Sequence, residues 1–239
     1  VLVTPAINAE GDVITLGWDG SALSATNTNS IPFTAGVAGE YTISVDLMSL
    51  KASPMGATNV SAVYELKQGQ VMDFGGIVDL NNWTVDYDFF VVNDDFTEVT
   101  FRAVDGYYLL TYDADKLYVK AEPVDAEGNP VKLSEDGTGT PWVIGANFGK
   151  PVIGPGWNTT EGAYAMAQVS EKVYQFTLTA PGQLAVSGAD FKFFHQKGWG
   201  GEFGSSSLTS DSDTFYVNAG SSDNGNVFLV DGKTLEMGS

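Results

Sequence analysis

The chain contains no cysteine among its 239 residues and only one histidine, His195. The missing cysteines exclude disulfides, thiol nucleophiles, iron–sulfur clusters and zinc held by thiolates within this chain. A single histidine also excludes a metal site built from several histidines of one chain. Carboxylate and carbonyl oxygens are plentiful, however, so we expect no cofactor other than a structural calcium ion, which the composition leaves open.

Basic residues are scarce as well: 11 Lys and Arg stand against 30 Asp and Glu, for a net charge of −19. Nucleic acids and anionic membrane surfaces are bound through clustered positive charge, so both are excluded as partners, whereas an uncharged glycan is compatible. No apolar run reaches the roughly 18 residues that a membrane helix needs. The chain begins without Met or a signal-like segment, so we expect a processed piece whose targeting segment was removed.

Helical periodicity is almost missing, and the best helical candidate, residues 160–169, is short. What dominates is an alternation of apolar and polar residues with period two, which is typical of half-buried strands. The alternating segments recur about every ten residues with turn-forming residues between them, as in sandwiches and barrels. We therefore predict an all-β fold of tandem antiparallel β-sandwich modules of the immunoglobulin-like kind. The clearest predicted strands are residues 12–16, 40–45, 84–91, 98–101, 116–119 and 173–178.

One polar, turn-rich stretch, residues 122–141, interrupts this pattern most clearly. We place a domain boundary near 130–138, which gives an N-terminal β-sandwich domain over 1–130 and a C-terminal one over 138–239. A weaker sub-boundary is expected near 52–56. A glycine, an alternating strand and an aspartate recur three times, at 39–46, 106–113 and 225–231. Either this repeat is ordinary hairpin chemistry or it marks the last strand of a repeated module.

The segment from Phe191 to Gly204 carries the strongest functional signal. An alternating strand, with Lys192 between two phenylalanines, leads into a glycine-rich loop that presents His195 and Trp199. Because glycine adopts backbone angles that other residues avoid, such a loop can leave an indole ring uncovered. A flat aromatic ring beside polar side chains suits a sugar, whose apolar face stacks on the ring while its hydroxyls form hydrogen bonds. This chemistry favours binding over catalysis.

The order of motifs in the C-terminal half resembles the carbohydrate-binding modules of the outer-membrane starch-utilisation proteins SusE and SusF. The resemblance covers roughly residues 138–239. Its motifs, in chain order, are Trp142-Val143-Ile144-Gly145, Pro155-Gly156-Trp157-Asn158, Tyr174-Gln175-Phe176-Thr177-Leu178, Phe191-Lys192-Phe193, Trp199, Phe203-Gly204 and the closing strand that runs from glycine to aspartate.

This resemblance implies a cell-surface lipoprotein without catalytic activity, exported and held at the outer membrane by an N-terminal lipid anchor that this chain lacks. Such a protein captures an oligosaccharide or polysaccharide, starch in the named relatives, beside an outer-membrane glycan transporter. The resemblance assigns Trp157 and Trp199 as stacking platforms and Lys192 as a partner for sugar hydroxyls. Proximity alone adds His195, Gln196 and Lys197 as candidates.

Two other classes of function remain open. The first is a β-sandwich spacer or protein-interaction module, which burial of both Trp157 and Trp199 would favour; their exposure on one face, about a disaccharide's length apart, would favour glycan binding. The second is a glycoside hydrolase, which needs two carboxylates on opposite sides of the scissile bond. Glu202, between Trp199 and Phe203, is the one acidic residue near the clustered aromatics.

Local sequence predicts the positions of the other tryptophans and of one acidic pair. Trp142 begins an apolar strand and is expected in the core. Trp18 and Trp83 follow turn residues and are candidates for a second site in the first domain. Asp86 and Asp88 are expected on one face of a strand, because side chains two residues apart in a strand share a face.

Overall fold

The computed structural model describes residues 5–7, 13–15, 17–18, 23–24, 42–46 and 51–56 as strand backbone. It describes residues 61–74, 78–179, 182–233 and 235 with their side chains, and Val60 as the start of a strand. Over these residues the fold is all-β, as the alternation predicts, and the one helical element is the short 3-10 turn Ser205–Ser207. The described residues include no helix long and apolar enough to cross a membrane.

The chain divides into two compact units, of which the first comprises Val1–Ala62, Asp73–Trp83 and Thr111–Leu117. Its strands pair as three antiparallel hairpins, β1 (Pro5–Ile7) with β2 (Val13–Thr15), β3 (Gly17–Trp18) with β4 (Leu23–Ser24), and β5 (Thr42–Asp46) with β6 (Lys51–Gly56). The sub-boundary expected near 52–56 falls within β6. The side chain of Trp18 lies outside the described residues, whereas Trp83 is described and half-buried.

The second unit comprises Val63–Met72, Thr84–Leu110 and Tyr118–Ser239. Its first sheet has the order β7-β11-β12-β8, and its last pair, β12 with β8, is parallel, which departs from the antiparallel pairing we predict. A separate antiparallel hairpin, β9 with β10, adds Phe90 and Phe101, whose rings meet edge to face beside Tyr108. The bounds are β7 Val60–Leu66, β8 Thr84–Val85, β9 Phe90–Val92, β10 Val99–Phe101, β11 Gly106–Asp113 and β12 Tyr118–Val124.

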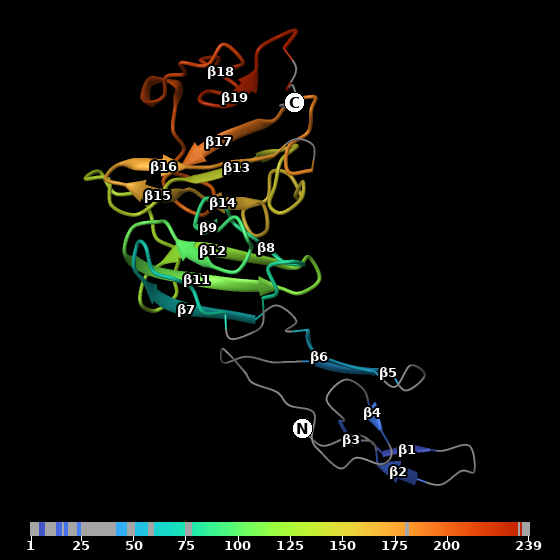
Figure 1. Cartoon of the computed structure of the whole chain (residues 1–239). Helices are drawn as coiled ribbons and strands as arrows, with labels where there is room; N and C mark the ends of the chain where they lie inside the picture. Colours follow the sequence, from blue (N-terminus) through green and yellow to red (C-terminus); the bar gives the residue numbers. More distant parts are fainter. Residues whose placement is uncertain are drawn as a thin grey trace. The chain divides into compact units, whose positions relative to one another are not determined.

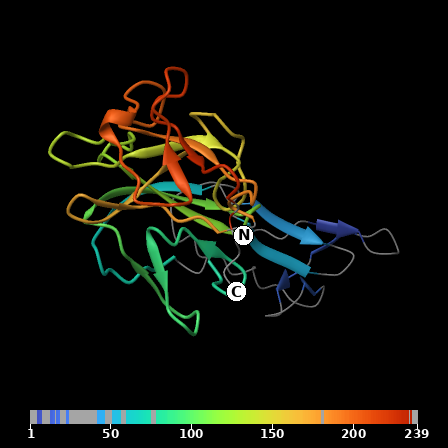
Figure 2. The same ribbon diagram turned by 90° about the horizontal axis from the view of Figure 1, so that it is seen from above.

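The larger sheet of this unit is antiparallel, with the order β14-β13-β17-β19-β18 (Figure 1). A hairpin of β15 and β16 accompanies it. In Figures 1 and 2 the green strand β12 lies next to the yellow strands of this sheet, and β12 contacts β14. The bounds are β13 Trp142–Ala146, β14 Ala163–Ala165, β15 Ala167–Ser170, β16 Val173–Gln175, β17 Asp190–Phe194, β18 Phe215–Val217 and β19 Val227–Leu229.

Two local predictions are wrong. Residues 160–169, the best helical candidate, contain β14 and the start of β15; their small and apolar side chains are buried on the sheet, and tertiary packing overrides the weak helical pattern. The strand predicted over 84–91 stops at Val85 and resumes at Phe90. Between them the chain turns, because the amides of Phe89 and Phe90 both donate to the carbonyl of Asp86. Asp86 and Asp88 therefore lie in this turn and not, as the sequence predicts, on one face of a strand.

Candidate functional site

Strand β17 separates a core face from a solvent-facing side of the larger sheet. Its residues alternate, so Phe191 and Phe193 pack against the core cluster around Phe148, as side chains of one strand face do. Asp190, Lys192 and Phe194 take the opposite face, where they line a pocket of about 300 Å³. The strand thereby supplies the floor of this pocket.

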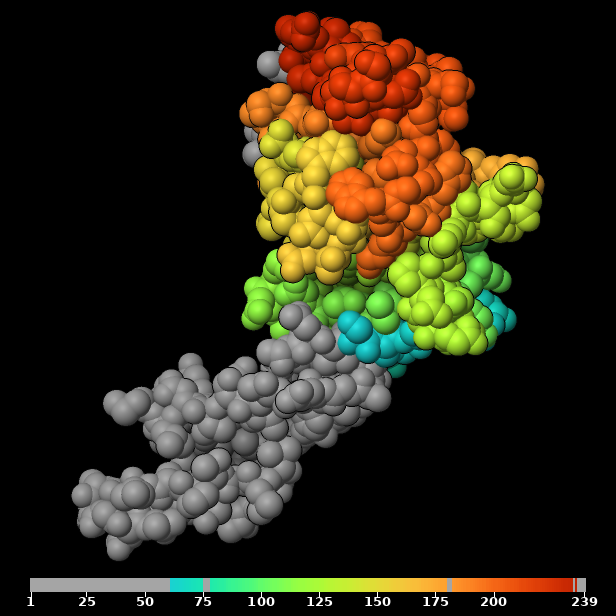
Figure 3. Space-filling view, turned by 180° about the vertical axis from the view of Figure 1, so that it is seen from behind, coloured from blue at the N-terminus to red at the C-terminus, as the bar shows by residue number. Residues whose placement is uncertain are grey.

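Trp157 and Trp199 form the aromatic part of the same pocket. They are 37% and 53% exposed, and their ring centroids are 6.3 Å apart with 24° between the planes. Trp199 also sets its ring against the edge of Phe194, at 5.8 Å. The two rings are thus stacked next to each other as one exposed aromatic pair, the tryptophan platform, and they lie closer together than the disaccharide spacing expected from the sequence. In Figure 3 the yellow segment that carries Trp157 adjoins the orange segment that carries Trp199.

The loop that presents Trp199 is held by short local hydrogen bonds. Gly200 and Gly201 have φ angles of +86° and +68°, a region that favours glycine, and the turn they make returns the chain to β17. There the amide of His195 donates to the carbonyl of Gly201 over 2.8 Å. The side-chain amide of Gln196 donates to the carbonyl of Trp199 at 2.8 Å. The glycine-rich sequence thus gives a tight, braced turn with an exposed ring at its tip.

Polar groups complete the pocket. Asn226, which is buried, donates its side-chain amide to Asp190 at 3.0 Å. Burial raises the pKa of Asp190 above its ordinary value, hydrogen bonds from Asn226 and Trp157 lower it in part, and the charge of Asp223 adds to the rise. The remaining polar residues of the lining are Lys192, Glu202 and Ser222. Three carboxyl groups and one ammonium group make this a surface that disfavours anionic ligands.

The structure brings together three of the six residues expected to bind ligand, since Trp157, Trp199 and Lys192 all line this pocket. The other three make different contacts, and Gln196 bonds the carbonyl of Trp199. His195 stacks flat on Phe203, with centroids 4.0 Å apart and planes at 6°, and its Nδ1 bonds the carbonyl of Gly201. Lys197 donates to Glu122 on β12 at 2.7 Å and lies over the ring of Trp142. Trp142 is fully buried, as predicted for a core residue.

Sequence reasoning missed most of the polar lining. Asp190 stands two residues before Lys192 on the same alternating strand, so period two was the signal that could have found it. Asp223 and Asn226 come from the β18–β19 loop and hairpin, and nothing local links them to Trp199. Their place depends on the pairing of β17 with β19, which brings distant segments together.

A second cluster of charges lies away from this pocket and is buried. Lys150 donates to Asp86 at 2.6 Å and also to Asp88, and the three side chains are 4%, 5% and 0% exposed. The backbone amide of Thr177 and the side-chain amide of Gln175 also donate to Asp88. Burial raises the pKa of Asp86, although the charge of Lys150 opposes the rise. Two carboxyl groups thus share one ammonium group out of solvent, so each charge of the cluster depends on its partners staying in place.

No metal centre accompanies these sites: the described part of the chain holds no group of three or more His, Asp and Glu side chains placed to bind an ion. The structural calcium ion left open by the composition therefore stays a prediction without a site in those residues.

Comparison with known proteins gives two family matches. A family model described as domain of unknown function DUF5125 matches residues 1–133, which is more than half of the chain. A second model, described as domain of unknown function DUF5121, matches residues 136–239, the part that contains the pocket. Neither a curated protein nor a solved structure matches the chain.

Proposed function

We propose that this chain, which belongs to the DUF5125 family, binds an uncharged oligosaccharide or polysaccharide without cleaving it. The binding site is the pocket formed by Trp157, Trp199 and the face of β17. One observation carries the proposal: Trp157 from one segment of the chain, and Lys192 and Trp199 from another, line one open pocket.

The chemistry of the pocket supports a sugar as the ligand. An exposed indole platform offers dispersion contacts and removes the apolar face of a pyranose ring from water. The hydrogen bonds then fix the orientation, since Lys192 donates, the carboxylates of Asp190 and Glu202 accept, and Asn226 can do both. Because the carboxyl groups outnumber the single ammonium group, glycans with uronate or sulfate groups are disfavoured relative to uncharged ones.

For the setting of this activity we propose capture of the glycan at the cell surface, beside an outer-membrane transporter. This part of the proposal rests on the resemblance of residues 138–239 to the SusE and SusF modules. The exposure of both tryptophans supports binding over a role as a spacer, for which a pair of buried rings would be expected.

A hydrolase is the second candidate, and one observation favours it. Asp190, Glu202 and Asp223 share the pocket, and the pKa of Asp190 is raised by burial, as a general acid requires. The two candidates differ in their products. A binding protein returns the glycan unchanged, whereas a hydrolase shortens it and loses this activity in Asp190→Asn or Glu202→Gln.

The test combines a glycan array with one exposed-ring variant. We expect the intact chain to retain a set of uncharged glycans and Trp199→Ala to lose that retention, with a thermal transition nearly unchanged because the ring is 53% exposed. Phe96→Ala is the matched control, since Phe96 is equally exposed and outside the pocket. Retention by Trp199→Ala equal to that of the control would overturn the proposal. Product analysis of each retained glycan separates binding from hydrolysis.

A further inference from the structure

We propose that the glycan site continues across β19 and β18, where Phe228 and Tyr216 form a second aromatic subsite. The site would then take a chain of several sugars, lying across the strands, and not a single sugar unit. This inference rests on the proposed function and extends it to the length of the ligand.

The strand register places the two rings beside the pocket. Asp190 on β17 stands directly opposite Phe228 on β19, and Phe228 stands opposite Tyr216 on β18. Residues opposite each other in a pleated sheet point to the same face. Asp190, Phe228 and Tyr216 therefore form a row across the strands, on the face that carries Lys192. Asn226, two residues before Phe228 on that face, already lines the pocket, so the pocket and the row are continuous.

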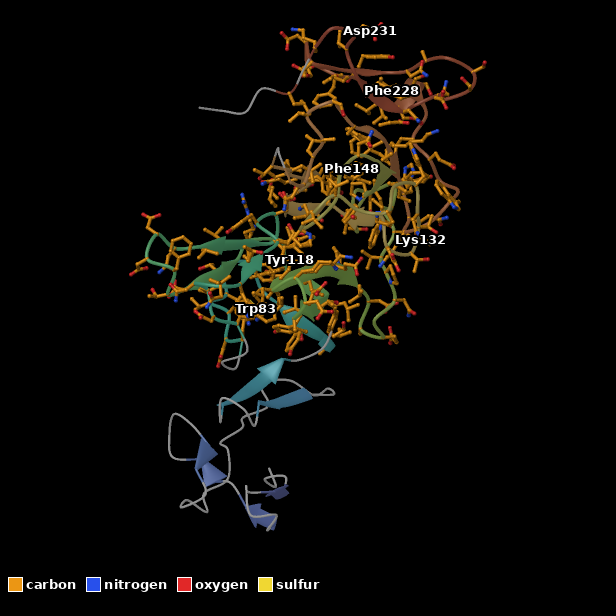
Figure 4. All side chains as sticks on the ribbon, turned by 90° about the vertical axis from the view of Figure 1, so that its right-hand side faces the viewer. Trp83, Tyr118, Lys132, Phe148, Phe228 and Asp231 are labelled. Atoms are coloured by element: carbon orange, nitrogen blue, oxygen red, sulfur yellow. The ribbon has the colours of Figure 1, made fainter. Side chains whose placement is uncertain are left out.

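The two rings also have the geometry of a surface platform. Their centroids are 5.8 Å apart with 35° between the planes. Tyr216 is 44% exposed and Phe228 half-buried. Figure 4 labels Phe228 on the red strand at one end of the sheet, away from the core residue Phe148. In Figure 3 the orange and red segments adjoin on the face that also carries the yellow segment of Trp157.

Packing in the core does not account for the positions of the Phe228 and Tyr216 rings. On the opposite face of the same strands, Phe215 packs against Phe191, which belongs to the core of the sandwich. Tyr216 projects the other way from a three-residue strand at the edge of the sheet. An aromatic ring that leaves the core and lies partly in water is the kind of group that binding surfaces use, because its hydroxyl stays solvated while its ring gives contact area.

The spacing of the aromatic and polar groups across the strands indicates how long a ligand the site suits. Neighbouring strands lie about 4.8 Å apart, so Tyr216 is about 10 Å from Asp190 along the row. The tryptophan platform, with its centroids 6.3 Å apart, offers stacking surface for the sugars at one end of the glycan. The platform and the row together therefore suit a longer oligosaccharide, and a disaccharide would occupy only the tryptophan end.

The experiment measures affinity against glycan length. The probes are disaccharides and hexasaccharides of the linear uncharged glucans, mannans and xylans on one array, with titration calorimetry for each pair retained by the intact chain. We expect Tyr216→Ala to weaken hexasaccharide binding about tenfold and to leave the disaccharide affinity unchanged. Tyr216→Leu, which keeps an apolar side chain on the edge strand and removes the flat ring, should do the same. Tyr107→Ala, at a tyrosine that is 39% exposed and outside the pocket, is the control.

The outcomes separate this inference from the proposed function. If Trp199→Ala abolishes binding while both Tyr216 variants bind hexasaccharides as the control does, the second subsite is wrong and glycan binding stands. If the Tyr216 variants weaken the disaccharide and the hexasaccharide equally, the ring belongs to one short site, which also overturns the inference. If no probe depends on Trp199, the proposed function fails and the inference fails with it.

Discussion

At the scale of single residues, Glu122 shows how this fold keeps a buried charge ionised. Its side chain is 7% exposed, and two ammonium groups reach its Oε1, Lys197 at 2.7 Å and Lys120 at 3.1 Å. Burial alone would raise the pKa of this carboxyl group. The charges of Lys120 and Lys197 and their hydrogen bonds outweigh burial, so the pKa lies below its ordinary value.

Glu122→Gln should therefore lower stability in a way that depends on pH. Because the pKa is lower in the folded chain than in the unfolded one, Glu122 contributes stability above the unfolded value near 4.5. That contribution is lost as the pH falls through the folded value. Near neutral pH we expect the variant to lose about 2 kcal/mol of unfolding free energy, the typical value for hydrogen bonds to a charged group.

Urea unfolding over a range of pH tests this. The difference between the intact chain and Glu122→Gln should shrink to nothing once the pH is below the folded pKa. Glu127→Gln, at an exposed residue, should differ little from the intact chain throughout. A loss of stability that is the same at every pH would contradict the assigned role of the charge.

At the scale of elements, the spacing of β13 and β17 decides where the pocket floor lies. Gly145 on β13 stands opposite Phe191. A Cβ at Gly145 would come within 2.2 Å of the carbonyl oxygen of Asp190 and 2.5 Å of the Cα of Phe191. Both are backbone atoms of β17 and cannot rotate aside. The missing side chain thus allows the close approach that sets Asp190 and Lys192 in the pocket.

Gly145→Ala should consequently push the two strands apart. Overpacking of this kind costs up to about 3 kcal/mol, and a displaced Asp190 should weaken glycan retention as well. Gly106→Ala is the control, because its Cβ would meet only the Tyr108 side chain at an ordinary 3.5 Å. Thermal unfolding and array retention measured on both variants check the prediction. Equal stability of the two variants would show that the strands tolerate the extra carbon.

Strand β17 also shows which features of the site the sequence predicts and which it does not. Its period-two pattern predicts the strand and the opposed faces of Lys192 and the phenylalanines, and both are found. The direction of Lys197 could not be predicted, since its partner Glu122 is 75 residues away in the chain. Likewise, the stacking of His195 on Phe203 depends on how the loop closes. Local pattern determines faces, whereas long-range pairing determines which side chains meet.

At the scale of the whole molecule, the segments matched by the two family models share buried contacts within the second compact unit. Asp86 and Asp88 belong to the first match, and Lys150 to the second. Trp142 adds a hydrogen bond from its indole to the carbonyl of Val131 at 3.0 Å. A buried ion cluster of this kind gives little net stability by itself, but removing one partner leaves the other charges unpaired in a dry site.

Lys150→Met is therefore expected to lower the unfolding free energy by about 4 kcal/mol, since methionine keeps the length of the side chain and removes its charge. Lys150 opposes the burial that raises the pKa of Asp86, so its removal raises that pKa further. The loss should then be smaller at acidic pH, where Asp86 is protonated and its uncompensated charge disappears. Lys132→Met, at an exposed lysine, is the control.

Hydrogen exchange shows which segments lose stability in Lys150→Met. If the cluster joins the two matched segments, amides of β9 and β10 and amides of β13 and β17 should all lose protection together in Lys150→Met, because their opening is one cooperative event. Faster exchange confined to one segment would show that the segments open independently.

The geometry of the pocket depends on this buried charge cluster. Residues 148–163 include both Lys150 and Trp157, and Lys150 is held by carboxylates of the first matched segment. We therefore expect Lys150→Met to weaken glycan retention through the position of Trp157, although Lys150 lies outside the pocket lining.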